Sequence, residues 1–195
     1  MHLRELTETF SAALGVPTIK VVEHHRSIRD GTEAIAGNFS ASDLERLQRM
    51  FNGKPGPTGG FDVDAFGCAF FLTAFLVDGP RHTVTKKTAA IMHAASTSRC
   101  RLTGETVFGT ALTTVLRDSA INARVSSVQL THREGGLAEI HYQHAGKAAV
   151  SRFWVNNLSP GEPSRAYTVG VAPPSTLRLI HQMLVANVAD PGGIQ

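Results

Sequence analysis

The sequence has few cysteines, a low share of charged residues and no long apolar run. Cys68 and Cys100 are the two cysteines among 195 residues, and they lack CxxC spacing. This argues against a disulfide framework and favours a reducing compartment. The longest uncharged apolar stretch, 65–77, is too short to cross a bilayer, and the acidic N-terminal segment does not read as a signal peptide. We therefore expect a cytoplasmic protein with no membrane partner.

The familiar catalytic signatures are also missing. There is no GxGxxG after a predicted strand, no Walker A loop, no GxSxG elbow and no HExxH or zinc-finger spacing. The histidines are scattered: neighbours His24 and His25 point in different directions on a helix, and the spacing of His141 and His144 places them on opposite faces of a strand. We expect no metal, no cofactor and no enzymatic activity, although a missing motif is weak evidence against an enzyme.

The sequence does contain enough apolar residues for a core. Hydrophobic residues make up 42% of the chain and charged residues 18%, which argues against wholesale disorder. The formal net charge of +3 permits a nucleic-acid partner without requiring one. The length fits one compact domain, or a small head with a larger body.

A segment rich in glycine and proline at 53–61 is the clearest candidate linker. It divides the chain into a helical head at 1–52 and a body at 62–195, which we expect to oligomerise or bind an effector. In the head, apolar spacing predicts helices over 5–14 and 17–29. Ser40 and Asp43 then stand at capping-box spacing and begin a third helix.

The body is predicted to be of mixed type. Its apolar spacing is typical of helices over 62–77, 86–95, 103–123 and 175–188. Runs rich in β-branched residues follow one another over 125–131, 137–144 and 148–155, with glycine at each bend, and 156–174 is predicted to be a long loop. The expected fold class is α+β, with a helix-turn-helix head and a body of helices packed on a small antiparallel three-stranded sheet.

The two N-terminal helices carry the strongest functional signal. A helix-turn-helix needs a small residue where the helices cross, a turn residue that accepts positive φ, and apolar residues that lock the helices together. Ser11 is the small residue and Gly15 the turn, and the locking residues are Leu14, Val16 and Val21. Residues 7–29 therefore resemble the helix-turn-helix of bacterial and phage regulators. Two positions depart from that pattern: Ser11 stands where alanine is commoner, and His24 stands where many members carry an aliphatic residue.

The resemblance implies double-stranded DNA as the partner, with the second helix in the major groove. The expected DNA-binding residues are Thr18, Ile19, Lys20, Glu23, Arg26 and Arg29. Lys20 and Arg26 suit guanine edges or phosphates, and Ile19 suits a thymine methyl group. Glu23 suits a cytosine amino group, whereas Arg29 suits a phosphate. The alternative for each residue is a solvated helix face.

Charge in the head is nearly balanced, because residues 1–50 hold six Lys or Arg and seven Asp or Glu. A single such head binds DNA weakly, since phosphate neutralisation supplies much of the affinity. A homodimer with two heads compensates for this. A second basic region, 81–101, contains no acid. Its possible phosphate contacts are Arg81, Lys86, Lys87, Arg99 and Arg101.

Three functions follow from these observations. The first is a sequence-specific transcriptional regulator that acts as a dimer and has a body able to bind a small-molecule effector. The second is a phage-type DNA-packaging component resembling a small terminase subunit, which would form a ring. The third is an α+β enzyme or ligand-binding module in which the first two helices are an ordinary hairpin. A pocket with convergent polar groups in the body favours the third function, or an effector-sensing version of the first.

Overall fold

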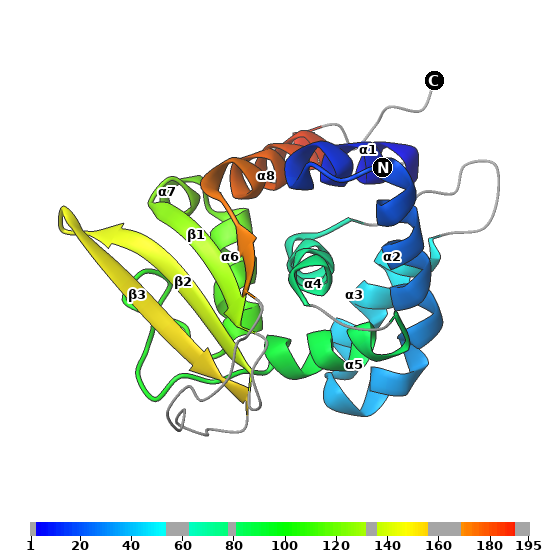
Figure 1. Ribbon diagram of the computed structural model, residues 1–195, viewed down its shortest axis with the longest axis horizontal. Coiled ribbons are helices and arrows are strands. Elements are labelled where there is room, and N and C mark those ends of the chain that lie inside the picture. Colours follow the sequence, from blue (N-terminus) through cyan, green and yellow to red (C-terminus); the bar gives the residue numbers. More distant parts are fainter. Residues whose placement is uncertain (1–2, 54–62, 78–80, 132–135, 156–168, 190–195) are drawn as a thin grey trace.

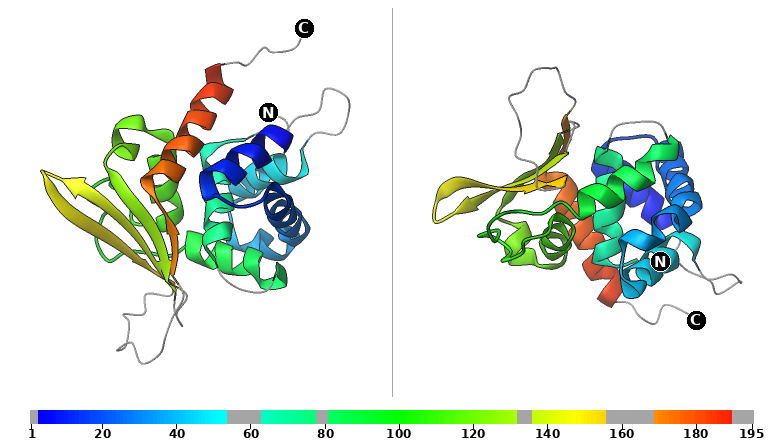
Figure 2. Two further views of the ribbon diagram at one scale, coloured as in Figure 1. Left: turned by 45° about the horizontal axis from the view of Figure 1, so that its top comes forward. Right: turned by 90° about the horizontal axis from the view of Figure 1, so that it is seen from below.

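The computed structural model describes residues 3–53, 63–77, 81–131, 136–155 and 169–189, and these form an α+β fold (Figure 1). The helices are α1 (Leu3–Leu14), α2 (Thr18–Gly31), the 3₁₀ helix η1 (Glu33–Asn38), α3 (Ala41–Asn52), α4 (Ala65–Leu76), α5 (Arg81–Met92), α6 (Phe108–Arg117), α7 (Ser119–Asn122) and α8 (Pro174–Ala189). The strands are β1 (Val125–Thr131), β2 (Leu137–His144), β3 (Lys147–Trp154) and β4 (Val169–Ala172). Helices α1 to α5 lie on one side of the molecule, and the sheet lies on the other together with α6 and α7 (Figure 2).

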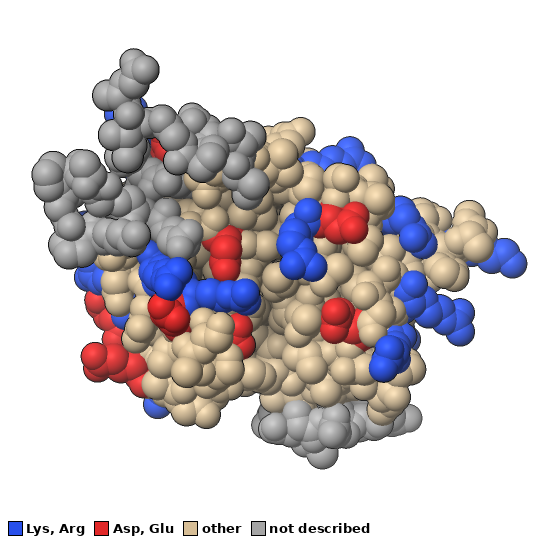
Figure 3. Space-filling view, turned by 180° about the vertical axis from the view of Figure 1, so that it is seen from behind, with Lys and Arg blue, Asp and Glu red and all other residues tan. Residues whose placement is uncertain are grey.

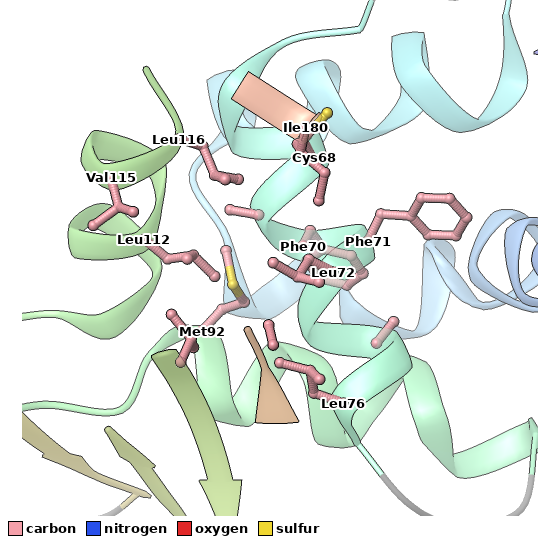
Figure 4. Packing of buried hydrophobic residues seen from close by; sticks show 14 of the residues in the cluster. Cys68, Phe70, Phe71, Leu72, Leu76, Met92, Leu112, Val115, Leu116 and Ile180 are labelled. Carbon is pink, nitrogen blue, oxygen red and sulfur yellow. The ribbon is translucent and has the colours of Figure 1, made fainter. Parts of the chain in front are cut away.

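Helix α4 lies at the centre of the helical side. Its sequence contains no charged residue, and most of its side chains are buried, as an apolar face on all sides predicts. The Asp64 carboxylate accepts a hydrogen bond from the Gly67 amide at 2.7 Å and so caps the helix. In Figure 4, Phe71 points away from Leu112 and Leu116 of α6, so α4 packs on both of its sides. Within the described ranges, no helix combines the length and apolar character needed to span a membrane.

The predicted head packs directly on the predicted body. Phe10 of α1 lies 4.7 Å from Phe71 of α4, measured between ring centroids. The Thr176 hydroxyl of α8 donates to the Ala13 carbonyl of α1. Residues from both parts belong to one buried hydrophobic cluster. Of the predicted linker 53–61, only Gly53 lies within the described residues.

The head helices form where the sequence predicts them. Helices α1 and α2 match the predicted 5–14 and 17–29 within two residues at each end. The predicted cap of α3 is confirmed, because the Ser40 hydroxyl accepts from the Asp43 amide at 3.1 Å.

The sheet is antiparallel throughout, with strand order β3-β2-β1-β4. The three predicted strands are confirmed as β1, β2 and β3. The prediction of only three strands is wrong, because β4 adds a fourth beside β1 from within the predicted loop 156–174. Four residues are too few for alternation to be recognised in a sequence. Gly170 permits the pairing here, since a Cβ at this position would collide with the Leu76 backbone.

The hairpin between β2 and β3 turns on two residues with positive φ, Ala145 at 50° and Gly146 at 75°. Two such residues match the right-handed twist of the adjoining strands. After the turn, Phe153 is fully buried and its ring lies 5.7 Å from that of Phe108 in α6. Trp154, which points to the other face, is half-buried. One face of the sheet therefore packs on α6.

The predicted long helix over 103–123 is wrong at its beginning and in its interior. Helix α6 begins at Phe108 and ends at Arg117, and the short α7 follows. The break occurs at Asp118, whose carboxylate accepts from the amides of Ala120 at 2.9 Å and Ile121 at 3.0 Å. This side chain caps a new helix in place of continuing the old one. The predicted helices 62–77, 86–95 and 175–188 correspond to α4, α5 and α8 with shifted ends.

Candidate functional site

The turn between α1 and α2 has the backbone that the sequence predicts. Gly15 has φ +64°, the left-handed conformation that glycine adopts without a steric penalty. The Ser11 hydroxyl donates to the Val16 carbonyl at 2.6 Å, and the Val16 amide donates to the Ser11 carbonyl at 3.2 Å. These bonds fix the short connection and hence the direction in which α2 leaves α1.

Helix α2 has one buried face and one exposed face. Val21, His25 and Ile28 are its buried residues. Of the predicted DNA-binding residues, Glu23 is half-buried and the following are exposed: Thr18, Ile19, Lys20, Arg26 and Arg29. Ile19 is 62% exposed, so its apolar side chain is accessible to a partner. The structure therefore brings five of the six predicted residues to the surface of one helix.

Charge on α2 is mixed. Arg29 pairs with the adjacent Asp30 at 2.9 Å, so part of its charge is already neutralised within the helix. Lys20 and Arg26 are exposed and form no ion pair with a described residue. In the face shown in Figure 3, basic and acidic side chains are mixed on the helical side, on the left. The charged side chains toward the right-hand edge, where the sheet lies, are basic.

The two histidines of α2 have packing roles. The His24 ring stacks on Phe75 of α4 with 4.3 Å between centroids, which accounts for a histidine where the helix-turn-helix resemblance expects an aliphatic residue. His25 is buried with its ring 5.3 Å from that of Phe51. The pKa of His25 is lowered to about 4, mainly by burial; a hydrogen bond with the Met50 backbone opposes this shift, and the charge of Arg29 adds to it. His25 is therefore neutral near pH 7.

The predicted phosphate contacts at 81–101 divide into two groups. Arg81, Lys86 and Lys87 belong to α5, although the side chain of Arg81 lies outside the described residues. Helix α5 packs along α2, and the Thr85 hydroxyl donates to the Ser27 carbonyl at 3.3 Å. The second group, Arg99 and Arg101, lies in the loop after α5 and is exposed. The basic region 81–101 is continuous in the sequence, but the fold divides it between α5 and the loop that follows α5.

Arg99 and Arg101 line a surface pocket of about 390 Å³ beside the free edge of β3. The loop contributes Ser96, Thr97, Ser98, Arg99 and Arg101 to the lining. Strands β2 and β3 contribute Tyr142, Ala149, Val150, Ser151, Arg152 and Trp154. Within the described residues, the lining holds three arginines and no carboxylate.

Short-range hydrogen bonds hold the loop of this pocket in place. The Cys100 amide donates to the Glu105 carbonyl at 2.8 Å, and the Gly104 amide donates to the Cys100 carbonyl at 2.7 Å. Cys100 itself is buried, so it anchors the loop between the two exposed arginines. The Ser96 amide closes the loop by donating to the Thr106 carbonyl at 2.8 Å.

The free edge of β3 also contributes backbone groups. Trp154 exchanges two hydrogen bonds with Ala95, of 2.9 and 2.7 Å, across this edge. Successive residues of an antiparallel strand direct their backbone polar groups to opposite sides. The N–H groups of Arg152 and Val150 therefore point to the same edge as those of Trp154. No described backbone group pairs with them there.

Sequence reasoning missed the contribution of the strands to this pocket. Arg152 and Trp154 lie within the predicted strand 148–155, and neither is among the predicted site residues. The Arg152 guanidinium also donates to the Glu139 carboxylate at 2.7 Å, and Glu139 lies 3.4 Å from His141. Alternation in the strand could have indicated that Arg152 shares a face with Trp154, but not that both lie beside Arg99 and Arg101.

Within the described ranges, no three His, Cys, Asp or Glu side chains gather into a metal-binding group. The geometry thus offers two surfaces, the exposed face of α2 and the pocket beside β3. No protein-family model matches the chain, and comparisons with curated proteins and with solved structures give no match either.

Proposed function

We propose that this chain is a sequence-specific DNA-binding protein, acting as a transcriptional regulator in the cytoplasm, and that α2 is its recognition helix. The observation that carries the proposal is the exposed face of α2, which begins directly after the Gly15 turn. Thr18, Ile19 and Lys20 occupy the first turn of that helix and are all exposed. In a helix-turn-helix, these are the positions that reach base edges.

The chemistry of the exposed face supports the proposal. Lys20 and Arg26 are free to contact guanine edges or phosphates, and Ile19 offers an apolar surface for a thymine methyl group. Helix α5 packs alongside α2 and carries Lys86 and Lys87, both exposed, which would contact the phosphate backbone beside the groove.

The limited positive charge on α2 favours a dimer. Glu23 and Asp30 lie on the same helix as the three basic residues, so one copy neutralises few phosphates. Two copies related by a twofold axis would engage two half-sites, and linkage would raise the affinity without new contacts. We expect the functional form to be a homodimer on double-stranded DNA.

The test is fluorescence anisotropy with labelled duplexes, first of random sequence across a salt series and then of a sequence obtained by selection. A Lys20→Ala/Arg26→Ala variant should bind the selected duplex about tenfold more weakly or worse, with a shallower salt dependence. The matched control is Arg117→Ala/Lys147→Ala, which removes the same charge from exposed positions on α6 and β3.

Unchanged affinity in the control together with a loss in the α2 variant would support the proposal. Equal losses of affinity in both variants would show that DNA binding depends on net charge and not on α2. No binding by the unaltered protein, even at low salt, would overturn the proposal and leave α1 and α2 as an ordinary helical hairpin.

A further inference from the structure

We propose that the pocket beside β3 binds a small organic oxyanion, a phosphate ester or carboxylate, through Arg99, Arg101 and Arg152. This inference does not rest on the DNA-binding proposal. Strand β3, which lines the pocket, and α2 lie on opposite sides of the molecule (Figures 1 and 2), so the two surfaces can be tested separately.

The charge of the pocket selects an anion. Arg99 and Arg101 form no ion pair with any described residue, and Glu139, the partner of Arg152, lies outside the lining. Guanidinium groups are always protonated near neutral pH and offer paired N–H donors that match the oxygens of phosphate or carboxylate. Glu139 offsets the charge of Arg152, which leaves Arg99 and Arg101 as the lining cations that a bound anion would neutralise.

The remaining polar groups include donors suited to the same ligand, although the backbone carbonyls of Val150 and Arg152 share the edge with their N–H groups. The edge N–H groups of Val150 and Arg152 have no described backbone partner, and oxyanions bind well to such N–H groups. Hydroxyl groups of the loop add further donors, from Ser96, Thr97 and Ser98. The hydroxyls of Tyr142 and Ser151, which also line the pocket, lie 3.3 Å apart and bond to each other. A metal cation would find no carboxylate among the described lining residues.

The size and the apolar wall of the pocket indicate an organic ligand. A volume of about 390 Å³ lies within the range of pockets that hold small molecules, roughly 300–1,000 Å³. Trp154, Val150 and Ala149 form the apolar part of the lining. The Trp154 ring can therefore cover the organic part of a ligand whose anionic group lies on the arginines.

The single tryptophan of the chain supplies the readout, because Trp154 is itself part of the lining. The experiment titrates the full chain with pyrophosphate and with citrate, at constant ionic strength, and follows tryptophan fluorescence. We expect a saturable change with at least one anion, and a midpoint about tenfold higher or more in Arg99→Gln/Arg101→Gln. The near-UV circular dichroism of the variant verifies its fold.

The matched control is Arg117→Gln/Arg178→Gln, which makes the same change in charge at exposed positions on α6 and α8, outside the pocket lining. An unchanged midpoint in this control supports the proposal. A linear response without saturation, or equal losses in both variants, would overturn it. If only duplex DNA changes the fluorescence and Arg99→Gln/Arg101→Gln abolishes that change, the arginines belong to a DNA surface and the small-anion proposal is wrong. Loss of DNA binding in the α2 variant has no bearing on this outcome, since the two readouts are separate.

Discussion

The exposed face of α2 and the pocket beside β3 are both basic surfaces, but they are built in different ways. The face of α2 comes from one continuous segment of 14 residues, and acids and bases are interspersed along that segment. The pocket combines a loop at 96–101 with residues from two strands at 142–154, and its described lining contains no acid. Helical periodicity predicts the first surface, because every member lies on one helix. No local pattern predicts the second, since it exists only after β3 and the loop meet.

The same contrast holds for the interior. The helical side has an aromatic core in which Phe71 contacts both Phe10 and Phe51. The sheet side packs Phe153 on Phe108 of α6. Between the two sides stands α4, which contacts both. Trp154, the single tryptophan, lies on the sheet side, so its fluorescence can test whether the two sides unfold as one unit.

The largest expected effect comes from breaking the core on the helical side. Phe10→Ala removes a fully buried ring and should lower the free energy of unfolding by about 3–5 kcal/mol. Urea unfolding is to be followed by far-UV circular dichroism, which reports all helices, and by Trp154 fluorescence, which reports the sheet. Because Phe10 packs on Phe71 of α4, we expect both transitions to shift together.

Leu179→Ala is the control for this prediction, since Leu179 is an exposed position on α8. It should change stability by less than about 0.5 kcal/mol. A shift of the circular dichroism transition alone, with fluorescence unchanged, would show instead that a head at 1–52 unfolds separately from the body.

The second largest effect is a dependence of stability on pH that originates in α2. Because the pKa of His25 is lowered to about 4 in the folded state, the unfolded chain takes up this proton near pH 6.5 while the folded chain does not. The free energy of unfolding is thus highest above pH 6.5 and falls toward pH 4, by up to about 3 kcal/mol. His25→Gln, which does not titrate, should flatten this part of the profile in chemical denaturation.

His82→Gln serves as the control for the pH profile, because His82 is exposed on α5. Its profile should follow that of the unaltered protein. Identical slopes for His25→Gln and the unaltered protein would assign the pH dependence to other groups and contradict the burial argument.

The sequence predicts the parts of this structure that depend on interactions between residues close together in the chain. The caps at Ser40 and the glycines at 15 and 146 act within a few residues, and the predicted turns and helices form there. Strand β4 depends on pairing with β1 from about 40 residues away, and its four residues are too few for alternation to be recognised in the sequence. Apolar spacing continues through Asp118 and so predicts a helix there. In the structure its carboxylate instead caps α7, which begins at the next residue. The meeting of Arg152 and Trp154 with Arg99 and Arg101 likewise depends on residues about 50 positions apart in the chain, so no local pattern predicts it.

The smallest expected effect concerns the ion pair between Glu139 and Arg152 at the pocket, and its influence on anion binding. The Glu139 carboxylate lies 2.7 Å from the Arg152 guanidinium, and the exposed fractions of the two side chains are 14% and 56%. A partly exposed pair of this kind is weak, so Glu139 competes only modestly with a bound anion for Arg152. Glu139→Gln should therefore lower the midpoint for anion binding by about two- to fivefold, as measured by Trp154 fluorescence. Glu33→Gln, an exposed position on η1, makes the same change in net charge and should leave the midpoint unchanged. A higher midpoint in Glu139→Gln would mean that Glu139 holds Arg152 in its binding position, so that the ion pair belongs to the architecture of the pocket and does not compete with its ligand.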